Sequence, residues 1–364
     1  MLAIPGQPAD PHTIAWGSPG IPHLQEPPVT IFAGVKDEST YNNHAYLEFF
    51  DGKFWAMWST HPTNGNFHGM TVVYSTSVDG TKWSAPGPIT TIPAGKRYVA
   101  RGFWSRNGKL LALASFDSGQ PKSQKYWAAP DLELQAFEWN PKTAKWSLLG
   151  VAYKDAINNF PPKKLPGGQW MMARRDYQFR LTLMTGGVAG FDRWAISEVP
   201  NPEDRSFNEP DVVVRADGSV AMHIRDNSRS KWLYRSVSKD GGLTWSVPEQ
   251  TNFPDATSKN FNLRLSNGLY VLVSNPSPNS RVPLTVGTSR DGATYDRIAI
   301  VDDTPGGPRI PGVDKGPGYT YPHAIEHGGY LYVIYSRHRD DIVVRRVKIG
   351  DLAKLPAPSW GMKQ

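Results

Sequence analysis

Short apolar runs separated by turn residues recur along the whole chain of 364 residues. Six segments share one layout, in which an apolar run, a turn with Asp-Gly, Asn-Gly or Gly-Gly, and a second apolar run follow one another. Such dipeptides between apolar runs are the strongest short-range signal for a β-hairpin. No apolar repeat of helical period extends beyond about two turns. The predicted hairpins lie at residues 46–58, 103–113, 164–172, 212–222, 263–273 and 324–335.

A second turn motif, the Asp box, alternates with these hairpins. It has the form Ser-x-Asp-Gly followed by an aromatic residue, with one extra glycine in the second copy, and it occurs at residues 77–83, 238–245 and 289–295. The aspartate accepts hydrogen bonds from its own turn, the glycine takes a positive φ, and the aromatic ring packs under the sheet. Segment 137–146 looks like a degenerate outer hairpin of the same kind.

The spacing of the hairpins predicts a repeat architecture. Their turns begin at residues 51, 107, 167, 217, 267 and 328, so one unit spans 50 to 61 residues. That length suits a four-stranded propeller blade with an inner and an outer hairpin. We therefore predict an all-β fold with a single propeller domain over residues 1–364, in which a strand at 29–32 closes the ring against the last blade. Six blades are visible in the sequence, and a fold with a seventh, degenerate blade is the alternative.

Composition narrows the function classes. The chain has no cysteine, which excludes disulfides, thiolate metal sites and a cysteine nucleophile. Its net charge is +7, and basic residues scattered without a nucleic-acid motif favour an anionic carbohydrate over nucleic acid as the partner. No apolar stretch approaches the roughly 18 residues of a membrane span. The motifs of zincins, phosphate-binding loops and α/β-hydrolases are absent as well.

Polar residues at strand ends are the candidates for chemistry, because propellers carry functional side chains around their central channel. Asn43 and His44 stand where the first inner strand begins, and His68 precedes a neighbouring strand. Two histidines there can supply a base and an acid near neutral pH, or they can merely bind loop carbonyls. Arg174 and Arg175 end a strand of the third hairpin, where alternation lets only one of them face the channel. A surface ion pair with the following aspartate is the alternative for Arg175.

Two further clusters flank later hairpins. Glu209 and Arg225 bracket the fourth hairpin, where they can bind a substrate or form a purely structural contact. Tyr321 precedes the inner strand of the last hairpin, and Arg337 ends its partner strand. Lys259, Asn260 and Asn262 occupy the equivalent place in the hairpin between them.

The stretch from Glu209 and Arg225 through the Asp box at 238–245 to Tyr321 and Arg337 resembles the repeat pattern of the sialidase-like superfamily of Asp-box propellers. This superfamily holds sialidases, other exo-glycosidases and several polysaccharide lyases. A sialidase needs three arginines around the substrate carboxylate, a tyrosine nucleophile with a glutamate partner, and an aspartic acid. The first arginine normally lies in an Arg-Ile-Pro motif near the N-terminus, but this chain has no arginine before residue 97.

The first predicted blade, with His44 and His68, resembles the propeller lyases that act on a uronic acid next to rhamnose. These are the ulvan lyases and the rhamnose-α-1,4-glucuronate lyases of gum arabic breakdown. In these families two histidines frame the site and an arginine neutralises the uronate carboxylate, a role that Arg174 or Arg175 matches by its place in the strand. Tyr153 is a loose match for the tyrosine that precedes this arginine. Those relatives are described as seven-bladed, so the resemblance favours seven blades over six.

The resemblance implies a lyase that cleaves L-rhamnose-α-1,4-D-glucuronate in gum arabic-type arabinogalactan side chains. In this β-elimination a base removes the C5 proton of the uronate and the C4 oxygen leaves, while Arg and Asn donors stabilise the enolate. Two alternatives stay open, namely an exo-acting glycoside hydrolase of the sialidase superfamily that uses Glu209 or Tyr321, and a non-catalytic glycan-binding propeller. The expected catalytic residues are His68, His44, Arg174 and His323, and the expected substrate-binding residues are Asn43, Arg175, Glu209, Arg225, Asn262, Tyr321 and Arg337.

We further expect a monomer that is secreted or periplasmic, acts on an anionic plant or algal glycan, and binds neither nucleic acid nor membranes. No cofactor is expected to be required. A structural Ca²⁺ in the channel stays open, although no EF-hand-like loop is present, and the sequence leaves the metal content unknown.

Overall fold

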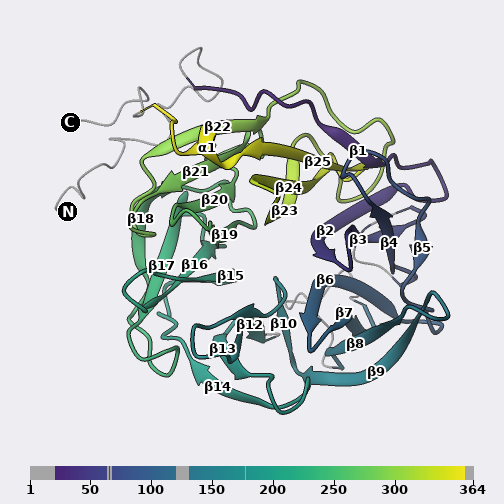
Figure 1. Cartoon of the computed structure of the whole chain (residues 1–364), viewed down its shortest axis with the longest axis horizontal. Helices are drawn as coiled ribbons and strands as arrows, with labels where there is room; N and C mark the ends of the chain where they lie inside the picture. Colours follow the sequence, from purple (N-terminus) through teal and green to yellow (C-terminus); the bar gives the residue numbers. More distant parts are fainter. Residues whose placement is uncertain (1–20, 64, 66–67, 120–130, 177, 357–364) are drawn as a thin grey trace.

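Six antiparallel sheets form a ring around a central channel in the computed structural model of the chain (Figure 1). The structure describes residues 21–63, 65, 68–119, 131–176 and 178–356. Each sheet is one propeller blade, because its first strand lies next to the channel and its last strand lies at the outside. The all-β propeller predicted from the turn pattern is therefore confirmed.

The first three blades follow one another along the first part of the chain. Blade 1 contains β2 (Tyr41–Phe50), β3 (Lys53–His61), β4 (Thr71–Ser77) and β5 (Gly87–Pro88). Blade 2 contains β6 (Arg97–Arg106), β7 (Lys109–Asp117), β8 (Glu133–Asn140) and β9 (Lys145–Lys154). Blade 3 contains β10 (Ala156–Asn158) and β11 (Lys163–Lys164), which both pair with β12 (Trp170–Asp176), then β13 (Leu181–Gly186) and β14 (Trp194–Glu198).

The last three blades complete the ring. Blade 4 contains β15 (Phe207–Val214), β16 (Val220–Asp226), β17 (Trp232–Ser238) and β18 (Glu249–Pro254). Blade 5 contains β19 (Phe261–Arg264), β20 (Tyr270–Ser274), β21 (Leu284–Ser289) and β22 (Arg297–Asp302). Blade 6 contains β23 (Tyr319–His327), β24 (Tyr330–Arg337), β25 (Asp341–Lys348) and β1 (Val29–Phe32), and the short helix α1 (Ile349–Leu352) follows β25. Val29 of β1 lies opposite Val344 of β25, so the two ends of the described chain share one sheet.

The expectation of seven blades, which came from the resemblance to the lyases, is wrong. The described residues form six sheets, one for each hairpin visible in the sequence. The degenerate hairpin at 137–146 is the outer β8–β9 pair of blade 2. A four-stranded blade needs an inner and an outer strand pair, and the described strands fill six blades without leaving a pair for another.

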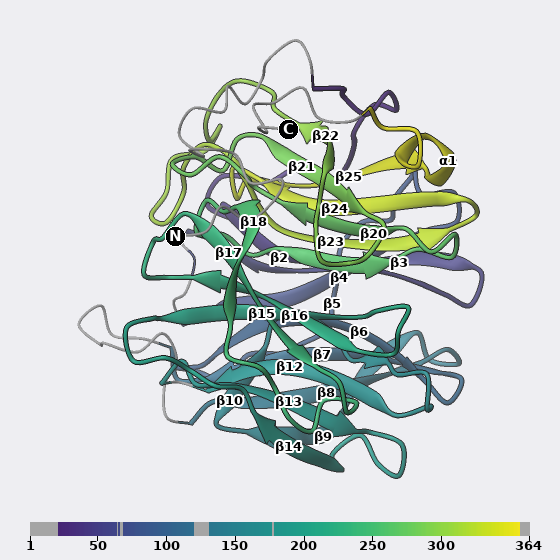
Figure 2. The ribbon, with the colours of Figure 1, turned by 90° about the vertical axis from the view of Figure 1, so that its left-hand side faces the viewer.

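Apolar side chains packed between neighbouring sheets hold the ring together. Between blades 3 and 4, for example, Leu183, Phe207 and Met222 are completely buried. Facing sheets packed in this way remove both of their apolar faces from water, which is the main driving force for the fold. Figure 2 shows the blades from the side, with blade 4 in the foreground.

The Asp boxes form the predicted turns on the outer hairpins of blades 1, 4 and 5. In blade 1, the carboxylate of Asp79 accepts hydrogen bonds from the amides of Lys82 and Thr81 at 2.9 and 2.8 Å. These two bonds hold the pKa of Asp79 below its usual value. Because the strands alternate in direction, the Asp boxes and the inner hairpin turns lie at one end of the channel. We call this the hairpin end, and we call the opposite end, where β2, β6, β15 and β23 begin, the loop end.

Candidate functional site

Four inner strands carry a β-bulge near the loop end, and each bulge presents a polar side chain. The register shifts in β2, β6, β15 and β23, at His44, Arg101, Glu209 and Tyr321. His44, Glu209 and Tyr321 have φ values of 55°, 47° and 55°, in the left-handed region that non-glycine residues rarely adopt. Bulges beside active sites commonly re-aim a side chain. These side chains come from blades 1, 2, 4 and 6 of the ring.

Glu209 is a buried carboxylate in an ion pair. Nη1 of Arg225 lies 2.6 Å from Oε2 of Glu209, and both side chains are largely buried. Burial raises the pKa of Glu209, but Arg225 first, with Lys259 and Arg281 adding to it, lowers this pKa to about 2. Glu209 is therefore negatively charged throughout the physiological pH range.

Tyr321 lies in the same electrostatic environment. Its ring meets the ring of His44 edge-on, with centroids 4.3 Å apart. Burial raises the pKa of Tyr321 to about 12, and the charge of Glu209 adds to this rise, while Arg225 and Arg281 oppose it. Tyr321 is thus a protonated phenol close to one carboxylate and two guanidinium groups.

Arginines from four blades surround this tyrosine and glutamate. Besides Arg225 and Arg281, Arg101 and Arg175 influence the cluster, since the pKa of Arg175 responds to burial first and then to Glu209 and Arg101. That pKa falls to about 9, which leaves Arg175 charged at neutral pH. The cations outnumber the carboxylates, so this end of the channel attracts an anionic group.

A second carboxyl group, Asp255, lies near these cations. Burial raises the pKa of Asp255 to about 7, against the influence of a hydrogen bond from the Ser258 amide and of two arginines. Asp255 is therefore only partly ionised at neutral pH, and the excess of cations persists.

Lys259 is a buried lysine at the floor of the site. Its Nζ lies 2.9 Å from the hydroxyl of Tyr46, and 4.0 and 5.3 Å from the ring centroids of Phe160 and Tyr321. It forms no ion pair within the part of the chain that the structure describes. Burial holds the pKa of Lys259 well below its ordinary value, although Glu209 works in the opposite direction.

The two histidines of the first blade have different surroundings. His44 is 1% exposed, and neither of its ring nitrogens has a hydrogen-bond partner among the described residues. Burial first, and then Arg101 and Lys259, lower the pKa of His44 well below its usual value, so its imidazole is neutral. His68 is exposed on the loop between β3 and β4 at the loop end, where its Nε2 contacts the carbonyl oxygen of Ser118 in blade 2.

The structure separates the two arginines that the sequence left equivalent. Arg175 is buried and belongs to the cluster around Glu209. Arg174 points to the other side of β12, where its guanidinium lies 5.2 Å from the ring of Tyr153 and its Nε donates to Thr182. It lines a separate cavity of about 520 Å³.

The remaining predicted residues make contacts within the fold, most of which join blades. The Thr320 hydroxyl of blade 6 donates to Asn43 of blade 1, and the Tyr295 hydroxyl donates to Asn262 within blade 5. His323 accepts a hydrogen bond from the Leu47 amide, and Arg337 lies 3.3 Å from Asp302. Asn43, Asn262, His323 and Arg337 thus have structural partners inside the fold.

Sequence reasoning missed Arg101 and Arg281 as site residues, and it noted Lys259 only by its place in the chain without giving it a role. Arg101 lies within a strand without any motif, and Lys259 and Arg281 lie in irregular segments before β19 and before β21. The one signal available was the position of Lys259 just before a predicted inner strand.

Two further properties concern metals and membranes. Among the described residues, no group of three or more His, Cys, Asp or Glu side chains is placed to share a metal ion. Within the same residues, no helix is long and apolar enough to cross a membrane.

Comparison with known proteins agrees with the propeller architecture. The BNR repeat-like domain family matches residues 157–333, which span blades 3 to 6 as far as β24. No curated protein matches the chain in sequence.

Three solved structures are similar to the chain, each with a TM-score of 0.69. A protein of unknown function from Dyadobacter fermentans is 18% identical, over 91% of this chain and 100% of its own. The intramolecular trans-sialidase of Ruminococcus gnavus is 14% identical, over 90% of this chain and 99% of its own. The leech intramolecular trans-sialidase is 13% identical, over 90% of this chain and 71% of its own. The chain therefore shares the propeller fold of these structures, and its residues 157–333 are similar to the BNR repeat-like domain family.

Proposed function

We propose that this protein is an exo-acting glycoside hydrolase that cleaves an anionic sugar from a glycan. The observation that carries the proposal is the meeting of Tyr321 and Glu209 among Arg175, Arg225 and Arg281 at the loop end. A sialidase-type reaction needs a tyrosine nucleophile, a glutamate partner and arginines for the carboxylate of the sugar. The likeness to two trans-sialidases supports the same choice.

The chemistry follows from the charges at the site. The phenol oxygen of Tyr321 attacks the anomeric carbon, and its proton moves toward Glu209 as the bond forms. The arginines bind the carboxylate of the sugar and so orient the sugar toward the tyrosine. We assign protonation of the leaving oxygen to His68, which is exposed at the same end of the channel. Water then releases the sugar from the tyrosine.

The test uses methylumbelliferyl glycosides of glucuronic, galacturonic and N-acetylneuraminic acid. Glu209→Gln should lower kcat by about 10²–10⁴-fold on the sugar that is cleaved, the usual effect of removing a general acid or base. Glu326→Gln is the matched control, because Glu326 also lies on an inner strand but at the hairpin end. A fluorinated analogue of that sugar should label Tyr321, detected by mass spectrometry, and Tyr321→Phe should abolish the label. Release of a saturated sugar without any labelled tyrosine would remove Tyr321 from this role.

A second candidate is the lyase that releases L-rhamnose from glucuronate, and His44 favours it. Its imidazole is neutral and has no hydrogen-bond partner among the described residues, so it is able to take a proton from C5 of a uronate. Arg175 would neutralise the uronate carboxylate from the neighbouring part of the channel. This proposal places the base on blade 1, whereas hydrolysis places the nucleophile on blade 6 and its base on blade 4.

Gum arabic distinguishes the two candidates. Elimination produces an unsaturated uronate that absorbs in the ultraviolet together with free rhamnose, and His44→Gln should abolish both. Hydrolysis produces no such absorbance. An intact glycan that still binds the protein would favour a glycan-binding propeller instead.

A further inference from the structure

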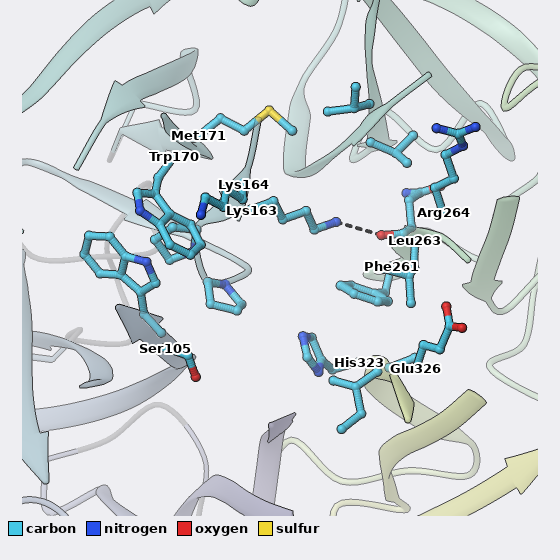
Figure 3. Close-up of a pocket in the computed structure, with 18 of the residues that line it drawn as sticks. Ser105, Lys163, Lys164, Trp170, Met171, Phe261, Leu263, Arg264, His323 and Glu326 are labelled. Carbon is cyan, nitrogen blue, oxygen red and sulfur yellow. Dashed lines mark hydrogen bonds between the residues drawn. The ribbon is translucent and has the colours of Figure 1, made fainter. Parts of the chain in front are cut away.

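A second cavity, of about 780 Å³, lies at the hairpin end of the channel. Residues from all six inner strands or the turns after them line it (Figure 3). Its size falls within the range of about 300–1,000 Å³ that is usual for small-molecule sites. None of Glu209, Arg225, Tyr321 or Lys259 lines it, so it is distinct from the site at the loop end.

An aromatic layer separates the two sites at mid-height of the channel. The rings of Phe160, Phe261 and His323 lie with neighbouring centroids 4.9 and 4.4 Å apart, and Tyr46 packs on His323 at 5.5 Å. Lys259 contacts Phe160 from the loop-end site, at 4.0 Å from the ring centroid. A ligand in the cavity at the hairpin end therefore contacts this aromatic layer and not the Glu209 and Tyr321 site at the loop end.

The wall of the cavity is mainly apolar. Proline, valine, leucine and isoleucine side chains contribute to it, together with aromatic rings that include those of Trp170 and Phe261. Figure 3 shows Trp170 on one side and Phe261 with Leu263 on the other, and Lys163 reaching between them. Lys163 covers the face of Phe261, with its Nζ 4.4 Å from the ring centroid. The surface left for a flat, apolar ligand body is therefore the ring of Trp170, because tryptophan supplies a large stacking surface.

The charges at the cavity favour an anion. Lys163 is occupied, since its Nζ contacts both carboxylate oxygens of Asp211 at 2.7 and 2.8 Å. Lys164 and Arg264 are exposed at the mouth, and within the described part of the chain neither has an ion-pair partner. Lys164 Nζ lies 5.7 Å from the Trp170 ring centroid, so the same ligand reaches both groups.

The two carboxyl groups of the cavity do not cancel these cations. Glu326 accepts hydrogen bonds from the amide and the hydroxyl of Ser266, which spread its charge over a hydrogen-bonded turn. Burial raises the pKa of Glu48 to about 7, so this group is partly neutral at physiological pH.

We propose that the cavity at the hairpin end binds an amphipathic organic anion, with a flat apolar body against Trp170 and a carboxylate or sulfonate group held by Lys164 beside that ring. Binding there is independent of the reaction at the loop end.

Anilinonaphthalene sulfonate, and phenylnaphthylamine, which has the same body without the sulfonate, test the proposal by fluorescence titration of the full chain. The sulfonate should bind saturably at one site, and Trp170→Ala should weaken its binding by about tenfold, because buried aromatic anchors carry most of the binding energy. Lys164→Gln should weaken the sulfonate and leave the neutral amine unchanged.

Matched controls come from the outer hairpin of blade 1. Trp83→Ala and Lys82→Gln change a half-buried tryptophan and an exposed lysine far along the blade from the channel, and both should bind the probes as the unmodified protein does. Glu209→Gln should also bind both probes as the unmodified protein does. The proposed anion site can therefore be confirmed even if the hydrolase proposal fails. Three results would overturn the proposal of an anion site in this cavity. They are binding of the sulfonate that does not saturate, binding by Trp170→Ala as tight as by the unmodified protein, and an equal loss of affinity for both probes in Lys164→Gln.

Discussion

Replacement of Arg225 by methionine should destabilise the fold in a pH-dependent way, because it leaves Glu209 buried without its ion-pair partner. The pKa of Glu209 falls from 4.5 to about 2 in the folded protein, against the effect of burial and chiefly through Arg225. At about 1.4 kcal/mol per pKa unit, the folded state gains about 3 kcal/mol from this carboxylate. Loss of one partner of a buried pair typically costs about 3–5 kcal/mol, which agrees with that figure.

The sign of the pH dependence follows from the direction of the pKa change. Because the pKa of Glu209 is lower in the folded state, its contribution is complete above pH 4.5 and is lost as the pH falls toward 2. The deficit of Arg225→Met should therefore be about 3 kcal/mol at pH 7 and much smaller at pH 3. Urea unfolding followed by tryptophan fluorescence measures it at both pH values.

An exposed ion pair provides the control. Lys109 lies 2.8 Å from Glu138, but its side chain is 61% exposed, against 15% for Arg225. Lys109→Met should therefore cost less than about 1 kcal/mol. The double variant Glu209→Gln with Arg225→Met should recover much of the stability that Arg225→Met loses. An Arg225→Met deficit no larger than that of Lys109→Met, or one equal at pH 7 and pH 3, would refute this account.

Three other variants test separate parts of the structure. Lys259→Met removes a buried amine whose pKa is lowered by burial. The free energy of unfolding of this variant, relative to that of the unmodified protein, should therefore rise as the pH falls from 10 to 7. A fall of this difference over the same pH range would show that Lys259 is charged and stabilising. Arg175→Gln should raise KM for the anionic substrate by about tenfold or more, whereas Arg174→Gln, the change on the other side of β12, should leave it unchanged. Met222→Ala should lower the free energy of unfolding by about 2–5 kcal/mol in urea titrations, because its side chain is completely buried between blades 3 and 4, and a loss below about 1 kcal/mol would contradict tight packing there.

Part of the candidate site could be found from the sequence because hairpin turns are local signals. Glu209, Arg225 and Tyr321 stand out as polar residues beside apolar strands that the turns delimit. The structure brings these three together from blades 4 and 6. Their roles in catalysis stay predictions.

Other parts of the site depend on contacts between residues far apart in the chain. The sequence does not show whether Arg174 or Arg175 faces the channel, because this depends on which side of β12 lies toward the channel in the assembled ring. Lys259 gains its place from Tyr46, more than two hundred residues earlier, and no local pattern marks that contact.

The sequence by itself determined the all-β repeat, the six hairpins and the Asp-box turns, because each rests on backbone conformations and hydrogen bonds within a few residues. Only the tertiary structure decided between six and seven blades, because the number of blades depends on which strands pair across the ring, and the described strands pair into six sheets. It also decided which polar side chains share the channel. Burial and the neighbouring Arg101 and Lys259 lower the pKa of His44, and Arg225, with Lys259 and Arg281, lowers that of Glu209 to about 2, because the assembled ring brings these groups together away from water.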